Sequence, residues 1–179
     1  EMLKHGGDAL FEALLDLYNK ALAGTMELPK SWKTSVIIVI YKDGDPTPPQ
    51  NYRPICIIPL LYKLFARLLY NRLAPILDPH QPADQAGFRH DFSTDDHLFT
   101  MTILHERSHE WQLPLWVSAI DFKKAFDTID QQQLWSALSE QHVPYGYILV
   151  LQKLYNGQRA QVKTNKRSKH FTIGRGTKQ

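Results

Sequence analysis

Cysteine is nearly absent from this sequence of 179 residues, in which Cys56 is the single one. One thiol excludes an internal disulfide framework and a zinc site with several cysteine ligands. Cys56 lies within the apolar residues 55–58, where a small core residue is expected and a nucleophile is the alternative. A chain without disulfides is typical of reducing compartments, so the sequence predicts an intracellular protein.

Long hydrophobic runs are absent as well. The longest, residues 36–41, has six residues, whereas a helix that crosses a bilayer needs ~20. We therefore expect no membrane partner, and no N-terminal signal segment is visible in this sequence. The sequence begins at Glu1 and ends at Gln179 in a polar stretch, which we interpret as a piece of a longer protein.

Acidic residues are missing from the C-terminal part of the chain. Residues 1–140 contain 13 Lys and Arg and all 18 Asp and Glu, whereas residues 141–179 contain 8 Lys and Arg and no acid. Such a basic segment favours an anionic partner such as nucleic acid. The alternative is a solvated hairpin that happens to lack acids.

The hydrophobic pattern predicts an α+β protein, with helices packed on a small antiparallel sheet. Helix boundaries are indicated by Asp8 as a first N-cap, Gly24 as its C-terminal stop, Ser93 with Asp96 as a capping pair, and Asp130 as a further cap. The predicted helices cover residues 8–23, 60–77, 93–111, 131–140 and 147–155. The predicted strands cover residues 35–41, which we expect to be buried, 54–59 and 115–122, and a hairpin formed by 159–164 and 169–173.

The most informative segment is residues 118–127, with the sequence SAIDFKKAFD. An apolar strand would lead directly into Asp121, and a carboxylate held at a strand end is an oxygen ligand suited to Mg²⁺. A helix cap or a turn residue is the alternative for this Asp on the residues alone.

Four segments in this order resemble motifs of reverse transcriptases, in the form common to non-LTR (LINE-like) retrotransposons. They are NYRPI at 51–55 followed by LYKLF at 61–65, QAGFR at 85–89 followed by Ser93 and Asp96, DFKKAFD at 121–127, and GRGTKQ at 174–179. The resemblance implies the fingers and a partial palm of a right-hand polymerase. It places the N-terminal helices and fingers in residues 1–114 and the first part of the palm in residues 115–179, before the Asp-Asp motif.

The resemblance also implies a metal site and a sugar filter. Asp121 corresponds to the first metal-binding aspartate of the family, which holds two Mg²⁺ ions together with the backbone carbonyl beside Phe122. Those ions would activate the primer 3′-hydroxyl and neutralise charge on the incoming triphosphate. Phe126 corresponds to the steric gate that leaves no space for a ribose 2′-hydroxyl; a plain core aromatic is the alternative.

Further nucleotide and template contacts follow from the same resemblance. Arg53 and Lys63 correspond to basic fingers residues that hold the triphosphate, and Gln179 to a palm glutamine that touches the nucleotide. Arg89 corresponds to the fingers arginine near the template. For Lys63 a solvated helix-face lysine is the alternative, and for Arg89 a structural ion pair. We expect the three basic fingers residues to face a common cleft with Asp121.

The implied reaction copies an RNA template into DNA from a DNA primer and deoxynucleoside triphosphates, in the nucleus, the cytoplasm or both. The motif that would supply the two remaining metal carboxylates does not occur within the 179 residues. The alternative is therefore a nucleic-acid-binding remnant of a decayed element, folded but without catalysis.

Overall fold

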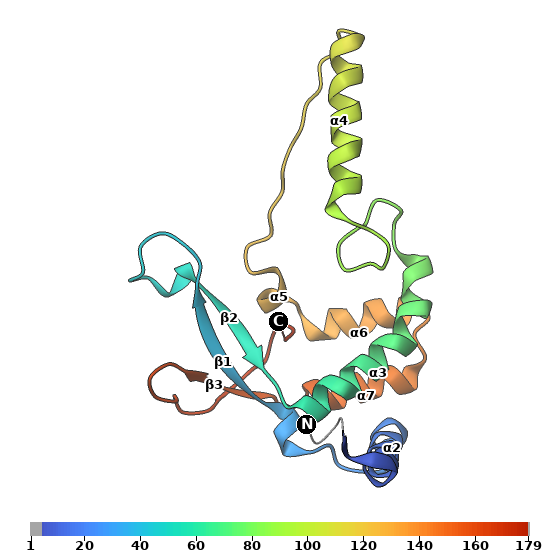
Figure 1. The fold of residues 1–179 in the computed structure, drawn as a ribbon, viewed down its shortest axis with the longest axis vertical. Coiled ribbons are helices and arrows are strands. Elements are labelled where there is room, and N and C mark those ends of the chain that lie inside the picture. The colour runs from blue at the N-terminus through green and yellow to red at the C-terminus, as the bar shows by residue number, and fades with distance from the viewer. Residues whose placement is uncertain (1–4, 179) are drawn as a thin grey trace.

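The computed structural model describes residues 5–178, in which helices surround one side of a small sheet and a single arm projects away from both (Figure 1). In chain order the elements are α2 (Gly7–Ala23), η1 (Lys30–Lys33), β1 (Thr34–Tyr41), η2 (Pro49–Asn51), β2 (Tyr52–Ile57), α3 (Leu60–Leu77), η3 (Asp78–His80), α4 (Thr94–Glu110), α5 (Ala125–Thr128), α6 (Gln131–Glu140), α7 (Tyr145–Tyr155), β3 (Arg159–Lys163) and β4 (Phe171–Thr172).

The sheet has the strand order β2-β1-β3-β4 and is mixed. β1 is antiparallel to β2, with Val39 opposite Pro54, and parallel to β3, with Ser35 opposite Ala160. β3 and β4 form the predicted antiparallel hairpin. The predicted combination of helices with a small sheet is confirmed, but the expectation of an all-antiparallel sheet is wrong. The chain passes through α3, α4, α6 and α7 before it enters β3, and such a long crossover allows a parallel pair.

The predicted helix ends are confirmed at three of four sites. Gly24 ends α2 in the left-handed conformation, and Ser93 and Asp96 form a reciprocal capping box before α4. The side chain of Asp130 accepts hydrogen bonds from two backbone N–H groups at the start of α6. Asp8 is not the cap of α2, because that helix begins one residue earlier, at Gly7, and Asp8 lies in its first turn.

An aromatic cluster forms the main core between α2, η1, α3 and α7. Trp32 and Phe65 are almost inaccessible to solvent, and their ring centroids lie 5.1 Å apart. The Tyr18 ring lies 5.4 Å from that of Phe65, and its hydroxyl donates to the carbonyl of Leu61 at 3.0 Å. A second cluster joins α3 to α6 and α7 through Leu73, Trp135, Val143 and Ile148. In β1 only Ser35 is buried, residues 36–38 are half-buried and Val39 to Tyr41 are exposed, so the prediction of a buried strand is wrong.

The arm consists of α4 and the segment that follows it (Figure 1). α4 has no buried residue, and residues 113–122 are exposed and form no regular structure. The prediction of a strand at 115–122 is therefore wrong. A strand needs a partner for its backbone N–H and C=O groups, and none of the described strands pairs with this segment. Among the described helices, none is long and apolar enough to cross a membrane.

Candidate nucleotide site

The segment KAFD folds into a single tight turn, α5. Lys124 adopts a left-handed backbone conformation with φ 54°, and its carbonyl accepts hydrogen bonds from the backbone N–H groups of Asp127 (3.0 Å) and Thr128 (3.2 Å). The Thr128 hydroxyl donates to the same carbonyl at 3.1 Å. This turn leaves Asp127 exposed and the Phe126 side chain half-buried.

The C-terminal segment 174–178 lies directly against this turn. The backbone N–H of Thr177 donates to the carbonyl of Phe126 at 2.8 Å, and that of Gly176 donates to the carbonyl of Ile129 at 2.9 Å. The side-chain amide of Gln131 donates to the carbonyl of Gly176 at 3.2 Å. Two motifs that are far apart in the sequence, KAFD and GRGTK, therefore meet through backbone hydrogen bonds.

A third motif reaches the same place through an aromatic contact. The rings of Phe88 and Phe126 meet edge to face, with centroids 5.9 Å apart at 87°. Phe88 belongs to the segment QAGFR, and its own backbone has φ 63°. The structure thus brings together residues from three of the sequence motifs, at 85–89, 121–127 and 174–179.

Lys178 anchors the same segment to the core. Its ammonium donates to the carbonyl of Trp32 at 3.1 Å and lies 4.2 Å from the centroid of the Tyr62 ring. Burial lowers the pKa of Lys178 to about 8 and raises that of Tyr62. Burial also raises the pKa of Tyr155, an effect partly offset by a backbone hydrogen bond with Lys178. Sequence reasoning missed this anchor; a Lys inside a Gly-rich motif was the only available signal.

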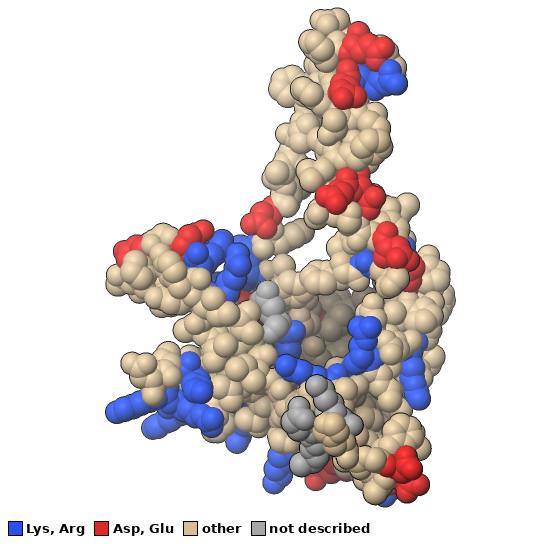
Figure 2. Space-filling model, in the orientation of Figure 1, with Lys and Arg blue, Asp and Glu red and all other residues tan. Residues whose placement is uncertain are grey.

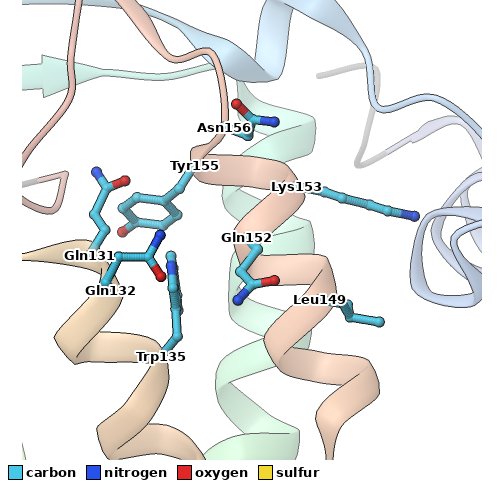
Figure 3. A pocket seen from close by; sticks show the side chains of 8 residues that line it. All are labelled: Gln131, Gln132, Trp135, Leu149, Gln152, Lys153, Tyr155 and Asn156. Carbon is cyan, nitrogen blue, oxygen red and sulfur yellow. The ribbon is translucent and has the colours of Figure 1, made fainter.

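A pocket of about 510 Å³ opens between α6 and α7, on the other side of Gln131 (Figure 3). The rings of Trp135 and Tyr155 belong to its lining and contact each other edge to face, with centroids 5.5 Å apart at 77°. Its lining is rich in side-chain amides and consists of Gln131, Gln132, Trp135, Leu149, Gln152, Lys153, Tyr155 and Asn156. The pocket is therefore polar, and Gln131 links it to the segment at Gly176.

Asp121 is exposed on the irregular segment after α4, and its neighbour Phe122 is 77% exposed. The expectation that a strand leads directly into Asp121 is wrong, because the residues before it form no regular structure. Within residues 5–178, no three His, Cys, Asp or Glu side chains gather into a group that could hold a metal ion. The donor type fits Mg²⁺, but these residues do not complete a two-ion site.

The three basic residues that the resemblance places in the fingers differ in their surroundings. Arg53 on β2 and Lys63 on α3 are both exposed. Arg89 is turned inward: its side chain is 13% exposed and pairs with Asp78 at 2.9 Å. It also donates to the carbonyls of Pro82 (2.9 Å) and Gln85 (3.2 Å). No hydrogen bond or ion pair joins any of the three to Asp121 in the described part of the chain. Gln179 lies outside the described residues.

The comparisons with known proteins identify the class. The family described as "Reverse transcriptase (RNA-dependent DNA polymerase)" matches residues 40–179, most of the chain. The chain therefore belongs to the reverse transcriptase family, in its non-LTR, LINE-like branch. This result confirms the resemblance of the four motifs and favours a polymerase over a non-catalytic remnant.

Several relatives are polymerases of mobile elements. The chain is 31% identical over 82% of its length to "Probable RNA-directed DNA polymerase from transposon BS" of Drosophila melanogaster, and covers 16% of that protein. It is 31% identical over 68% of its length to "RNA-directed DNA polymerase from mobile element jockey" of the same species, covering 14%. A polyprotein from retrotransposable element R2 of Popillia japonica is 32% identical over 66% of the chain, which covers 16% of it. The chain spans about a sixth of the length of the curated relatives it matches.

Proposed function

We propose that this chain forms the fingers and the first part of the palm of a polymerase that copies RNA into DNA, with residues 1–114 in the N-terminal and fingers region and 115–179 in the palm. The observation that supports this most is the meeting of three motifs at Phe126. Thr177 hydrogen-bonds its carbonyl and Phe88 contacts its ring. A polymerase needs its nucleotide-binding groups on a shared, rigid frame.

The proposed partners are an RNA template, a DNA primer and deoxynucleoside triphosphates, inside the cell in the nucleus, the cytoplasm or both. Lys and Arg side chains gather over the β3–β4 hairpin and on the rim of a hollow between the sheet and the helices (Figure 2). Phosphate groups are held mainly by such cations, independently of base sequence.

In this proposal the nucleotide is bound from both regions of the chain. Arg53 and Lys63 are exposed, so both are free to reach a triphosphate. Phe126 excludes the ribose 2′-hydroxyl, and Gln179, which follows the anchored Lys178, touches the nucleotide. Arg89 contributes to template binding indirectly, because its ion pair with Asp78 holds in place the loop that lies near the template.

Asp121, with the carbonyl beside Phe122, is proposed to supply one part of the site for two Mg²⁺ ions. One carboxylate cannot hold both ions, so the other ligands have to come from outside residues 5–178. When bound, Mg²⁺ lowers the cost of developing negative charge at a phosphoryl group. The contribution of this chain is an exposed carboxylate with no competing ion pair within residues 5–178.

Primer extension on an RNA template tests the proposal, in a polymerase-competent protein that contains this chain together with the missing metal ligands. Asp121→Ala is expected to abolish extension without lowering the melting temperature, because Asp121 is exposed. Asp43→Ala, at an exposed acid in the β1–β2 loop, is the control and should extend normally. The 179-residue chain alone should extend nothing. Extension that survives Asp121→Ala, or extension by the chain alone, would contradict the proposal.

A further inference from the structure

Gly176 lies at a close approach between the C-terminal segment and the α5 turn. Its backbone has φ +82°, a conformation that L side chains rarely adopt. A Cβ atom at this position would lie 2.8 Å from the carbonyl oxygen of Asp127, 2.9 Å from its Cα and 2.9 Å from the carbonyl oxygen of Phe126. All three atoms are backbone, so no side-chain rotation can relieve the clash.

The absence of a side chain at Gly176 therefore allows the C-terminal segment to lie directly against the backbone of Phe126. The hydrogen bond from Thr177 to the carbonyl of Phe126 forms only while the two backbones remain this close. The Gln131 amide holds Gly176 from the other side, where Figure 3 shows its side chain on the first turn of α6. The ring of Phe126 is attached to the backbone that this contact fixes.

We infer that Gly176 is a positioning residue for sugar selection: the absence of a side chain there sets where the Phe126 ring stands against the ribose of the incoming nucleotide. This inference rests on the proposed role of Phe126. Exclusion of the 2′-hydroxyl by the Phe126 ring depends on the position of that ring to a fraction of an ångström. A shift of the turn would therefore change selection between the two sugars more than it changes extension with the correct one.

The test measures kcat/KM for a deoxynucleotide and for the matching ribonucleotide, in a polymerase-competent protein that contains this chain. Gly176→Ala is expected to reduce the preference for the deoxynucleotide about tenfold. This loss is smaller than the ~10²-fold loss of rate that a misplacement of reacting groups by a full ångström causes, because the shift of the ring should be smaller. Gly174→Ala is the matched control, because a Cβ there has no neighbour within 4 Å and the position has no positive φ. The control should keep the wild-type preference.

A second variant, Phe126→Val, separates the proposed gate role of Phe126 from the inferred positioning role of Gly176. If Phe126→Val relaxes selection and Gly176→Ala does not, the inference about Gly176 is wrong and the proposed gate stands. If Phe126→Val leaves selection unchanged, the gate is wrong and the role of Gly176 fails with it. Equal losses for both sugars in Gly176→Ala would mean a merely structural role and would also overturn the inference.

Should Gly176→Ala fail to fold, as judged by circular dichroism, Gln131→Leu takes its place. This change removes the hydrogen bond to the Gly176 carbonyl without adding atoms at the contact. It should lower the sugar preference in the same direction by a smaller factor. An unchanged preference in Gln131→Leu would then overturn the inference.

Discussion

Lys178 places a positive charge inside the fold, where its ammonium contacts the Trp32 carbonyl and the face of the Tyr62 ring. A carbonyl dipole and an aromatic face partly replace the water that the ammonium loses. They do not replace it completely, since burial still lowers the pKa of Lys178 to about 8. The folded and unfolded chains therefore bind this proton differently, which makes the stability depend on pH.

The sign of this dependence gives a first prediction. Below pH 8 both states hold the proton, whereas between about 8 and the ordinary value of 10.5 the unfolded chain keeps it and the folded chain releases it. The free energy of unfolding therefore rises with pH in this window. Relative to Lys178→Met, the wild type should gain about 2 kcal/mol between pH 7 and pH 9.5 in urea denaturation. The comparison with Lys63→Met, an exposed lysine, should show no such gain. A difference that stays constant or shrinks with rising pH would contradict the prediction, because the folded chain would then hold this proton at least as tightly as the unfolded chain.

Arg89 provides a second prediction at the residue scale. Its guanidinium satisfies Asp78 and two backbone carbonyls and lies 4.1 Å from the centroid of the Phe92 ring. Arg89→Ala leaves these acceptors without a donor, so the free energy of unfolding should fall by about 2 kcal/mol. Arg53→Ala, at an exposed arginine, should change it by less than about 0.5 kcal/mol. Equal effects of the two changes would argue against a structural role for Arg89.

At the scale of elements, features set by local chemistry could be predicted and features set by distant partners could not. The capping box at Ser93 and Asp96, the cap at Asp130 and the stop at Gly24 depend on a few neighbouring residues. The strand at 115–122 has the apolar composition of a strand, but pairing requires a second chain segment that the pattern of one segment does not specify. The parallel pairing of β1 with β3 depends likewise on the path of the intervening helices.

The arm carries the third prediction. Trp111 and Trp116 are 62% and 91% exposed, whereas Trp32 and Trp135 are buried. Acrylamide should therefore quench one part of the tryptophan fluorescence of the 179-residue chain readily and leave another part protected. The double change Trp111→Phe with Trp116→Phe should remove the readily quenched part, while Trp32→Phe should keep it. Protection of all four tryptophans would mean that the arm is covered in solution, for instance by self-association through its apolar side chains.

At the scale of the whole molecule, the candidate site was predictable as a set of residue types but not as an arrangement. The motifs identified Phe126 and the GRGTK segment, and the structure joins them. The same motifs could not show that Arg53 is exposed whereas Arg89 is turned inward, because both are arginines within matching motifs. The difference comes from Asp78, which pairs with Arg89 and draws its side chain into the structure. Gly176 illustrates the same limit: a glycine is required there because the backbone of Phe126 and Asp127, far away in the sequence, lies against it.

The charge distribution gives the last prediction. All 18 acids precede residue 141, and 8 of the 21 Lys and Arg follow it without opposition. The 179-residue chain should therefore bind single-stranded RNA weakly, with an affinity that falls steeply as salt rises. The double change Lys166→Gln with Lys169→Gln, in the β3–β4 hairpin, should make the negative slope of log K against log salt shallower by about one to two. Each lost phosphate contact reduces the magnitude of this slope by ~0.7. Lys20→Gln removes a lysine already paired with Asp16 at 2.7 Å and should leave the slope unchanged. Filter binding at several salt concentrations measures these slopes, and an unaltered slope in the hairpin variant would show that the basic C-terminal part does not contact the phosphates.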